Sequence, residues 1–572
     1  MISFYQKIAE VHKKRRSFQG LSNEEFQYLL ADAILDKGLF ASPNWNWRYG
    51  GVRYAPGVLP EGPVSKILVS QWPGQLGDVC MSAPVFSVLR QKYPYAEISF
   101  LSGRTAQEIF LGNPDVDALV HNPLDIYLDA VLSGQPIKHE KLLQDIFQIT
   151  ATLREAKYDL LINLQVLPMS ASLARLCSPK RTIGMSLTED GMPVLSGNAW
   201  TAYLFCVSAN LFRKYNLLHR TRIFSLMVDE TESFTPGPSV HIHPNAVRRV
   251  QSFFDHAGIE DKHRVIGLNP MSGTPIRQWG HFDLLARRLS DELKARVIVF
   301  GAPSEANQVD EIARRAGSNV IKATEFTLQE LMAAICGCDL FITNDTGPMH
   351  LASILGRKVL ALFGPTSFRE VGPWGTEYQV LQASSCHECY SQSCIRPGEF
   401  CMSRITVDDV FRLVEKVLKS EPPPSFGDHL VHHCSSDKSV VASEEKCPGM
   451  LIQQVFERKN QFRKTFPAPC TLSSGLSRDL ATECNTLKAL LEKALFSVDG
   501  VHHVDPTILL AVHQSILRTN GILKPLVVIN DLQFLDKRMP LEKDLQAFRN
   551  FSQGLLKDLH LLMNSLQDPL TS

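Results

Sequence analysis

The stretch that decides the fold is residues 340–355, LFITNDTGPMHLASIL. Its first four residues are apolar or β-branched and predict a buried strand. A helix is expected to begin within the small and polar residues that follow and to continue through the apolar residues 351–355. A continuous apolar strand followed directly by a helix is typical of a parallel sheet covered by helices on both faces. The stretch therefore predicts an α/β fold.

The same alternation of strands and helices extends in both directions. In the unit that contains this stretch, strands are predicted at 265–268, 295–300, 340–343 and 359–363, with helices at 282–293, 306–316 and 328–336. Upstream, a second set has strands at 67–69, 96–101 and 160–164, and a helix at 79–92. Two facing, doubly wound, Rossmann-like domains are expected to bind ligands in the cleft between them, at the carboxyl ends of their strands.

Composition divides the chain into five segments. Residues 1–62 are expected to form a helical extension and a connector, because Ser22 and Glu25 make a capping box ahead of an apolar helix. The two α/β domains then occupy 63–238 and 239–420. Residues 421–449 are polar, begin with three prolines and predict a flexible linker. Residues 450–572 predict a helical C-terminal extension, whose apolar faces form a bundle core or bind a partner or membrane surface.

Charge and hydropathy argue against several classes of protein. The chain has 59 basic and 59 acidic residues, so no net field favours nucleic acid or anionic lipid. Its N-terminus lacks the pattern of a secretory signal. No run reaches the roughly 18 apolar residues that a membrane-spanning helix requires. We therefore expect a cytoplasmic protein with no transmembrane segment and no nucleic-acid partner.

Three predicted strand ends of the second domain carry groups suited to a nucleoside diphosphate. In residues 344–350, small residues at a helix start let backbone N–H groups approach a phosphate. Residues 269–279, NPMSGTPIRQW, add hydroxyls and the cation of Arg277. Glu305 follows another strand, where a carboxylate can accept hydrogen bonds from ribose hydroxyls. Each turn alone is a moderate signal, since such residues also cap helices. Their occurrence at one sheet edge predicts a nucleotide site.

These stretches, together with LFGPT at 362–366, closely resemble glycosyltransferase family 9, the ADP-heptose lipopolysaccharide heptosyltransferases. The first domain agrees, because Gly77, Asp78 and Pro84 match the family's GD-x5-P pattern after its first strand. The resemblance implies a GT-B fold and inverting transfer of a heptose from ADP-heptose, with no cofactor or metal required for catalysis. It also implies an acceptor in the Kdo-lipid A inner core of lipopolysaccharide, at the cytosolic face of the inner membrane.

The resemblance implies a role for each matching residue. Asp78 would be the catalytic base that deprotonates the acceptor hydroxyl, a task that suits a carboxylate. Asp78 also fits a plain helix cap. Glu305 would bind the ribose of the donor. The other residues implied to bind the donor are Ser272, Gly273, Arg277, Asp345, Thr346, Gly347 and His350.

Two departures from the family pattern leave other functions open. Arg277 stands where the family usually has lysine, and a planar guanidinium keeps the charge but changes its geometry. Gly280 and His281 stand where the family often has proline. The alternatives are a GT-B transferase for another sugar nucleotide or a protein acceptor, and a non-catalytic nucleotide-sugar-binding scaffold. The presence of Asp78, Arg277, Glu305 and His350 together favours an enzyme.

A cluster of four cysteines follows the last strand of the second domain. In a cytosolic chain, such closely spaced thiols can form a closed tetrahedral zinc or iron site. We expect a structural metal here, with unligated thiols or a redox-labile pair as the alternatives. The expected ligands are Cys386, Cys389, Cys394 and Cys401.

Overall fold

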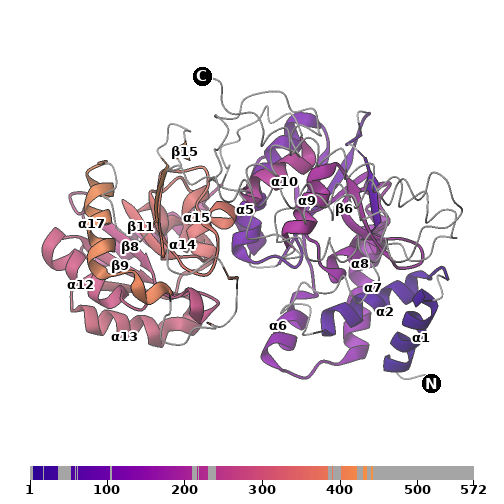
Figure 1. Ribbon diagram of the computed structural model, residues 1–572, viewed down its shortest axis with the longest axis horizontal. Coiled ribbons are helices and arrows are strands. Elements are labelled where there is room, and N and C mark those ends of the chain that lie inside the picture. The colour runs from indigo at the N-terminus through magenta and orange to yellow at the C-terminus, as the bar shows by residue number, and fades with distance from the viewer. Residues whose placement is uncertain are drawn as a thin grey trace, which may run out of the picture.

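The chain forms two mainly parallel sheets flanked by helices, which Figure 1 shows as two lobes. This arrangement confirms the predicted α/β class. Residues 442–572, which include the predicted C-terminal extension, lie outside the described residues. The computed structural model describes residues 4–441 except positions 17–18, 37–52, 58, 61, 104–105, 209–215, 217, 230–239, 384–388, 391–393, 395–400, 422–429 and 435–439.

The first sheet has seven strands in the order β1-β7-β6-β5-β2-β3-β4. Neighbouring strands pair in parallel, except β6 and β7, which are antiparallel. Strand β2 lies between β3 and β5, so the direction of winding reverses there and creates a switch point at its carboxyl end. The strands are β1 Arg53–Pro56, β2 Lys66–Ser70, β3 Glu97–Leu101, β4 Ala118–Val120, β5 Leu160–Asn163, β6 Arg181–Leu187 and β7 Pro193–Gly197.

The second sheet has eight strands in the order β10-β9-β8-β11-β12-β13-β14-β15. Strand β8 lies between β9 and β11, so this sheet also has a switch point, beside the carboxyl ends of β8 and β11. The strands are β8 Val265–Asn269, β9 Arg296–Phe300, β10 Val320–Ala323, β11 Leu340–Asn344, β12 Val359–Phe363, β13 Tyr378–Gln382, β14 Leu430–Cys434 and β15 Val440–Val441.

The last two strands correct the prediction of a flexible linker at 421–449. Strand β14 pairs antiparallel with the edge strand β13, and β15 pairs antiparallel with β14. Residues 430–434 and 440–441 of this segment therefore extend the second sheet. These strands could not be predicted, because the proline-rich start and polar composition of the segment outweigh a short run of β-forming residues.

Helices connect the strands of both sheets. Helix α5 begins at Leu76 and not at Val79, so Gly77 and Asp78 lie in its first turn. In the first lobe the helices are α5 Leu76–Lys92, α6 Asp125–Ser133, α7 His139–Glu155, α8 Pro168–Cys177, α9 Ala199–Ser208 and α10 Arg220–Val228. In the second they are α11 Pro244–His256, α12 Phe282–Leu293, α13 Ala306–Ala316, α14 Leu328–Cys336, α15 Gly347–Ile354, α16 Phe368–Val371 and α17 Val407–Leu418.

Two N-terminal helices precede the first sheet. They are α1, Phe4–Arg16, and α2, Asn23–Leu35, and α2 packs against α7 and α8. The predicted capping box of α2 is confirmed, since the side chains of Ser22 and Glu25 each accept a hydrogen bond from the other's backbone N–H. The Phe4 ring stacks on His139 at a centroid distance of 4.3 Å, which attaches α1 to α7.

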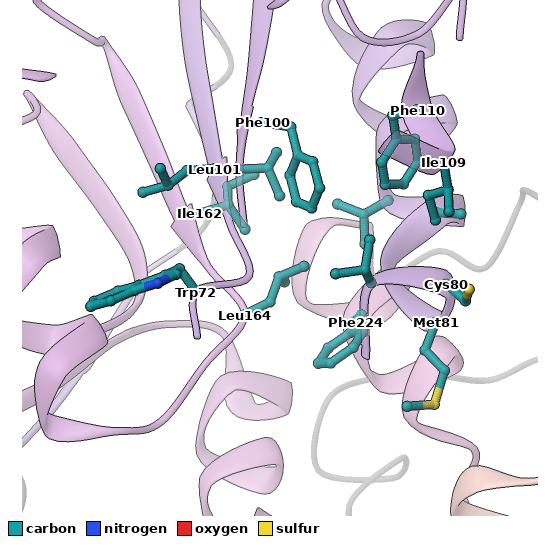
Figure 2. Packing of buried hydrophobic residues seen from close by; sticks show 14 of the residues in the cluster. Trp72, Cys80, Met81, Phe100, Leu101, Ile109, Phe110, Ile162, Leu164 and Phe224 are labelled. Carbon is teal, nitrogen blue, oxygen red and sulfur yellow. The ribbon is translucent and has the colours of Figure 1, made fainter. Parts of the chain in front are cut away.

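One hydrophobic core is continuous between the two lobes. Figure 2 shows part of it, where Phe100 of β3 lies against Phe110, which ends a short 3-10 helix (η1, Ala106–Phe110). The same cluster includes Val69 of the first sheet and Phe363 of the second. A separate cluster fills the far face of the second sheet beneath α12 and α17. The continuous core holds the two switch points in a defined relation to each other.

Candidate functional site

The loops after β8 and β11 meet at the switch point of the second sheet, and Asn344 joins them. This buried side chain ends β11 and donates from Nδ2 to the Pro270 carbonyl oxygen at 2.7 Å. Its Oδ1 accepts from the backbone N–H of Trp279 at 3.1 Å. Both ends of the 270–279 loop are therefore fastened to the strand end that leads into α15. The predicted meeting of these two stretches is confirmed.

Arg277 and Asp345 form an ion pair within this pair of loops. Arg277 Nη1 lies 3.2 Å from Asp345 Oδ2, and the Asp345 side chain is only 5% exposed. Thr366, after β12, donates from Oγ1 to the same carboxylate oxygen at 2.7 Å. Asp345 thus directs the guanidinium and joins three strand ends. Thr366 lies in the LFGPT stretch, and no role was predicted for it from the sequence.

The N-terminus of α15 offers backbone N–H groups at the same switch point. Thr346 is the N-cap, with an extended backbone, and its side chain makes no capping hydrogen bond. Gly347 is the first helical residue, followed by Pro348. The first-turn N–H groups of a helix have no partner within the helix, and the helix dipole favours an anion beside them. This end of α15 is suited to a phosphate.

His350 is buried in the next turn of α15 and is 6% exposed. Burial lowers the pKa of its imidazole to about 4, and the positive charges of Arg220 and Arg277 act in the same direction. The ring is therefore neutral at physiological pH, so it can donate one hydrogen bond without adding a charge.

The N-terminus of α5, from the first lobe, packs directly against α15. The approach is so close at Gly77 that a Cβ added there would lie 2.8 Å from His350 Cδ2. Asp78, the next residue, is half-buried in the first turn of α5. One Asp78 oxygen lies 3.4 Å from the backbone nitrogen of Gln75, so the carboxylate also caps its own helix. The chain thus brings Asp78 and His350 to the same junction.

Ser272 and Gly273 lie in the fastened loop after β8. The Ser272 carbonyl oxygen accepts from Gln278 Nε2 at 3.0 Å, which closes the loop on itself. A Cβ added at Gly273 would meet no atom within 4 Å. Open space at this turn is compatible with a ligand that approaches the backbone.

Glu305 ends the short turn Pro303–Glu305 after β9. Its Oε2 accepts from the Ala302 N–H at 2.7 Å, so one oxygen of the carboxylate is engaged in its own turn. The other oxygen makes no bond in this capping arrangement. The predicted contact with ribose stays a prediction.

A buried ion pair beside the junction was not predicted from the sequence. Arg220, the first residue of α10, places Nη2 2.6 Å from Glu370 Oε1 on α16, and the Glu370 side chain is fully buried. The preceding His219 bonds to the Gly372 carbonyl oxygen and stacks on Trp374. Residues 150 positions apart carried no shared sequence signal, so only the tertiary structure reveals this pair.

The cysteine cluster is described in part. Cys389 is exposed, Cys394 is intermediate and Cys401 is buried, whereas Cys386 lies outside the described residues. Within the part of the chain that the structure describes, no three His, Cys, Asp or Glu side chains gather as a metal site. The three described cysteines alone therefore do not fit a metal ion, and the four-cysteine site stays a prediction.

No helix among the described residues combines the length and the apolar character needed to cross a membrane.

Comparison with known proteins gives a consistent picture. Residues 146–398 match the model of glycosyltransferase family 9 (heptosyltransferase). Lipopolysaccharide heptosyltransferase 3 of Escherichia coli is 26% identical over 362 residues, which are 60% of this chain and 97% of the relative. Lipooligosaccharide heptosyltransferase 2 of Campylobacter jejuni is 30% identical over 165 residues, which are 27% of this chain and 52% of the relative.

Among solved structures, a family 9 glycosyl transferase from Veillonella parvula resembles the fold. Its TM-score is 0.52 at 23% sequence identity, and the match covers 63% of this chain and 99% of that chain. The match therefore supports the α/β fold of the chain.

Proposed function

We propose that this chain, which belongs to glycosyltransferase family 9, transfers a heptose from ADP-heptose to the inner core of lipopolysaccharide. One observation carries the proposal. The two turns that match the family's pattern, Gly77-Asp78 and residues 344–350, meet where α5 packs on α15, although they come from different sheets. A carboxylate and an anion-binding helix end at one junction suit transfer from a nucleoside diphosphate to an alcohol.

The second sheet would hold the donor. When the glycosidic bond to phosphate breaks, negative charge grows on the departing ADP. Hydrogen-bond donors and cations that are already in place lower the barrier by stabilising that charge. Arg277 supplies a fixed cation because Asp345 orients it. The first-turn N–H groups of α15 supply hydrogen-bond donors for the same charge. Neutral His350 would donate a hydrogen bond beside them.

The first sheet would supply the base. Asp78 takes the proton of the acceptor hydroxyl as the acceptor oxygen bonds to the anomeric carbon and the bond to the ADP oxygen breaks. This single displacement inverts the anomeric centre and leaves the proton on the carboxylate and the electron pair on ADP. Asp78 is suited to this task because it projects from the helix that touches His350.

We infer that the acceptor is the lipid A-core at the cytosolic membrane face, with the enzyme peripheral to that membrane. The resemblance to the lipopolysaccharide and lipooligosaccharide heptosyltransferases supports this inference. We also propose that residues 450–572 form a helical extension that binds a partner.

The test is a transfer assay with the full chain, ADP-heptose and a heptose-free lipopolysaccharide core. We expect the acceptor to gain the mass of one heptose and ADP to be released in equal amount. UDP- and GDP-sugars serve as competing donors. Transfer from one of these donors alone would keep the transferase class and remove heptose, and donor binding without any transfer would favour the scaffold.

We also propose that Cys386, Cys389, Cys394 and Cys401 hold a structural zinc or iron ion when all four are arranged around it. The support is the chemistry of the donor set, since four thiolates suit a closed tetrahedral site. Metal analysis of the purified chain tests this, with Cys394→Ser as the comparison. Equal metal content in the two proteins would contradict it.

A further inference from the structure

The Arg220–Glu370 ion pair joins the two lobes. Arg220 begins α10, which packs on α5 and α9 of the first lobe, whereas Glu370 lies on α16, which follows β12 of the second sheet. The charged atoms are 2.6 Å apart, and the side chains are only 14% and 0% exposed. Removing one partner of such a pair leaves a buried charge uncompensated, which is strongly unfavourable.

Two further contacts, both made by His219, join the same two segments. The His219 ring lies 4.7 Å from the Trp374 ring in a stacked arrangement. Its Nε2 donates to the Gly372 carbonyl oxygen at 2.9 Å, while Nδ1 accepts from the Thr221 N–H at 3.2 Å. These partners fix one neutral tautomer, in agreement with a pKa that burial lowers to about 3. Together with the ion pair, they restrain the separation and the rotation of α10 relative to α16.

Tyr390 holds the pair on the side of the second lobe. Its hydroxyl donates to Glu370 Oε2 at 3.1 Å, and its backbone N–H donates to the Pro365 carbonyl oxygen at 2.9 Å. Pro365 precedes Thr366, which bonds to Asp345. Asp345 lies in the turn after β11, which together with the 270–279 loop forms the donor loops. Glu370 is therefore connected to the donor loops through a short series of contacts.

On the side of the first lobe, α10 adjoins the helix that carries Asp78. A pocket between α5, α10 and α15 is lined by Cys80, Thr221, His350 and Trp374, among others. Cys80 follows Asp78 on α5, and Thr221 follows Arg220 on α10. A shift of α10 would therefore displace the side chains that line this pocket, where α5 contacts His350.

We propose that Arg220 and Glu370 are positioning residues that set the approach of Asp78 to the donor held by the second lobe. The inference rests on the proposed function and adds residues that touch neither substrate. The apolar core alone would hold the lobes together, but it allows small sliding movements, whereas a buried guanidinium–carboxylate pair allows a narrow range of geometries. Misplacement of reacting groups by about 1 Å can reduce the rate about 100-fold.

The experiment compares Glu370→Gln, Arg220→Gln and Arg220→Lys with the wild-type chain. Asp117→Asn is the matched control, because Arg90 and Asp117 form an ion pair of the same 2.6 Å length within the first lobe. For each variant, ADP affinity is measured by calorimetry and kcat by the transfer assay. Folding is checked by circular dichroism and thermal unfolding.

We expect kcat to fall about 10- to 100-fold in Glu370→Gln and Arg220→Gln. ADP affinity should stay within about twofold, since neither residue belongs to the donor loops. Arg220→Lys, which keeps the charge, should recover part of the loss, and Asp117→Asn should retain wild-type kcat. Wild-type kcat in a folded Glu370→Gln protein would overturn the proposal, and so would a loss of ADP affinity equal to the loss of kcat.

A second readout does not depend on transferase activity. Hydrogen exchange of the Val79 N–H, which donates to the Gln75 carbonyl oxygen at 3.0 Å at the start of α5, reports whether the junction loosens. The proposal predicts faster exchange there in Glu370→Gln and unchanged exchange in Asp117→Asn. Unchanged exchange in both variants would contradict the positioning role even if the chain proved to lack the proposed transfer activity.

Discussion

The turns that follow β2 and β11 occupy corresponding places in the two sheets but lie among opposite charges. Each leaves a strand at the switch point of its sheet and leads into a helix whose first turn contains glycine. The turn after β11 lies beside the Arg277 cation and the neutral His350. The turn after β2 presents the carboxylate of Asp78. A helix start therefore does not determine function by itself, and the surrounding side chains decide whether it suits an anion or a base.

The carboxylates of the two turns also differ in their surroundings. Asp345 is buried and held by Arg277 and Thr366. Asp78 is half-buried, and the hydrogen bond to its own N-cap is long, at 3.4 Å. Asp345 is suited to organising the loops, whereas Asp78 is accessible enough to meet a hydroxyl. The same residue type thus has a structural task in one lobe and is proposed to have a chemical task in the other.

Among substitutions that test this difference between the two turns, Asp78→Asn is expected to have the largest effect. The amide oxygen can still accept from Gln75, so α5 should be retained, but the amide cannot take a proton. We expect the rate of transfer to fall about 10²- to 10⁴-fold, with ADP affinity unchanged. Single-turnover kinetics and calorimetry on the same preparation measure the two quantities. Transfer at the wild-type rate would reduce Asp78 to a helix cap.

Arg277→Ala tests the turn after β11, which is proposed to bind the diphosphate. Loss of a charge-assisted contact to the diphosphate costs roughly 1.5–3 kcal/mol, so ADP should bind about 10- to 150-fold more weakly. Stability should fall as well, because Asp345 keeps only Thr366 as a polar side-chain partner in this network. Arg277→Lys should lie between the variant and the wild type. An ADP affinity that stays the same in Arg277→Ala is the outcome that would exclude Arg277 from the donor site.

Gly77→Ala tests the contact between the two turns. The new methyl group would lie 2.8 Å from His350 Cδ2, so either the His350 ring shifts or α5 and α15 move apart. We expect a loss in kcat of about tenfold, by the same misplacement argument. Gly280→Ala is the control, since a Cβ there meets no atom within 4 Å. If both variants have wild-type kcat, the close approach of the helices has no role in transfer.

The smallest expected effect is the change in stability with pH. Burial lowers the pKa of His350 to about 4 and that of His219 to about 3. Both values lie below the usual 6.5, so below about pH 6.5 the unfolded chain binds more protons than the folded one, and stability falls as the pH falls. The difference in melting temperature between wild type and His219→Gln should therefore shrink from pH 7.5 to pH 4.5. A constant difference would contradict the buried neutral state.

The α/β class, most strand positions and the meeting of residues 269–279 with 344–350 could be predicted, because apolar periodicity and topology fix them. The Asn344 and Thr366 bonds could not, since a polar side chain at a strand end has several partners within reach. The Arg220–Glu370 ion pair could not be predicted for another reason: it depends on how the two lobes pack against each other. Strand β14 was missed because a polar segment can still pair its backbone with a sheet edge.

The most direct measurement is calorimetric titration of the full chain with ADP, UDP and GDP. We predict selective binding of ADP that weakens in Arg277→Ala and Glu305→Ala but not in Asp78→Asn, because the donor groups lie on the second lobe and the base on the first. Preferred binding of UDP or GDP would contradict the ADP-heptose donor. Weaker ADP binding in Asp78→Asn would contradict the division of donor and base between the two lobes.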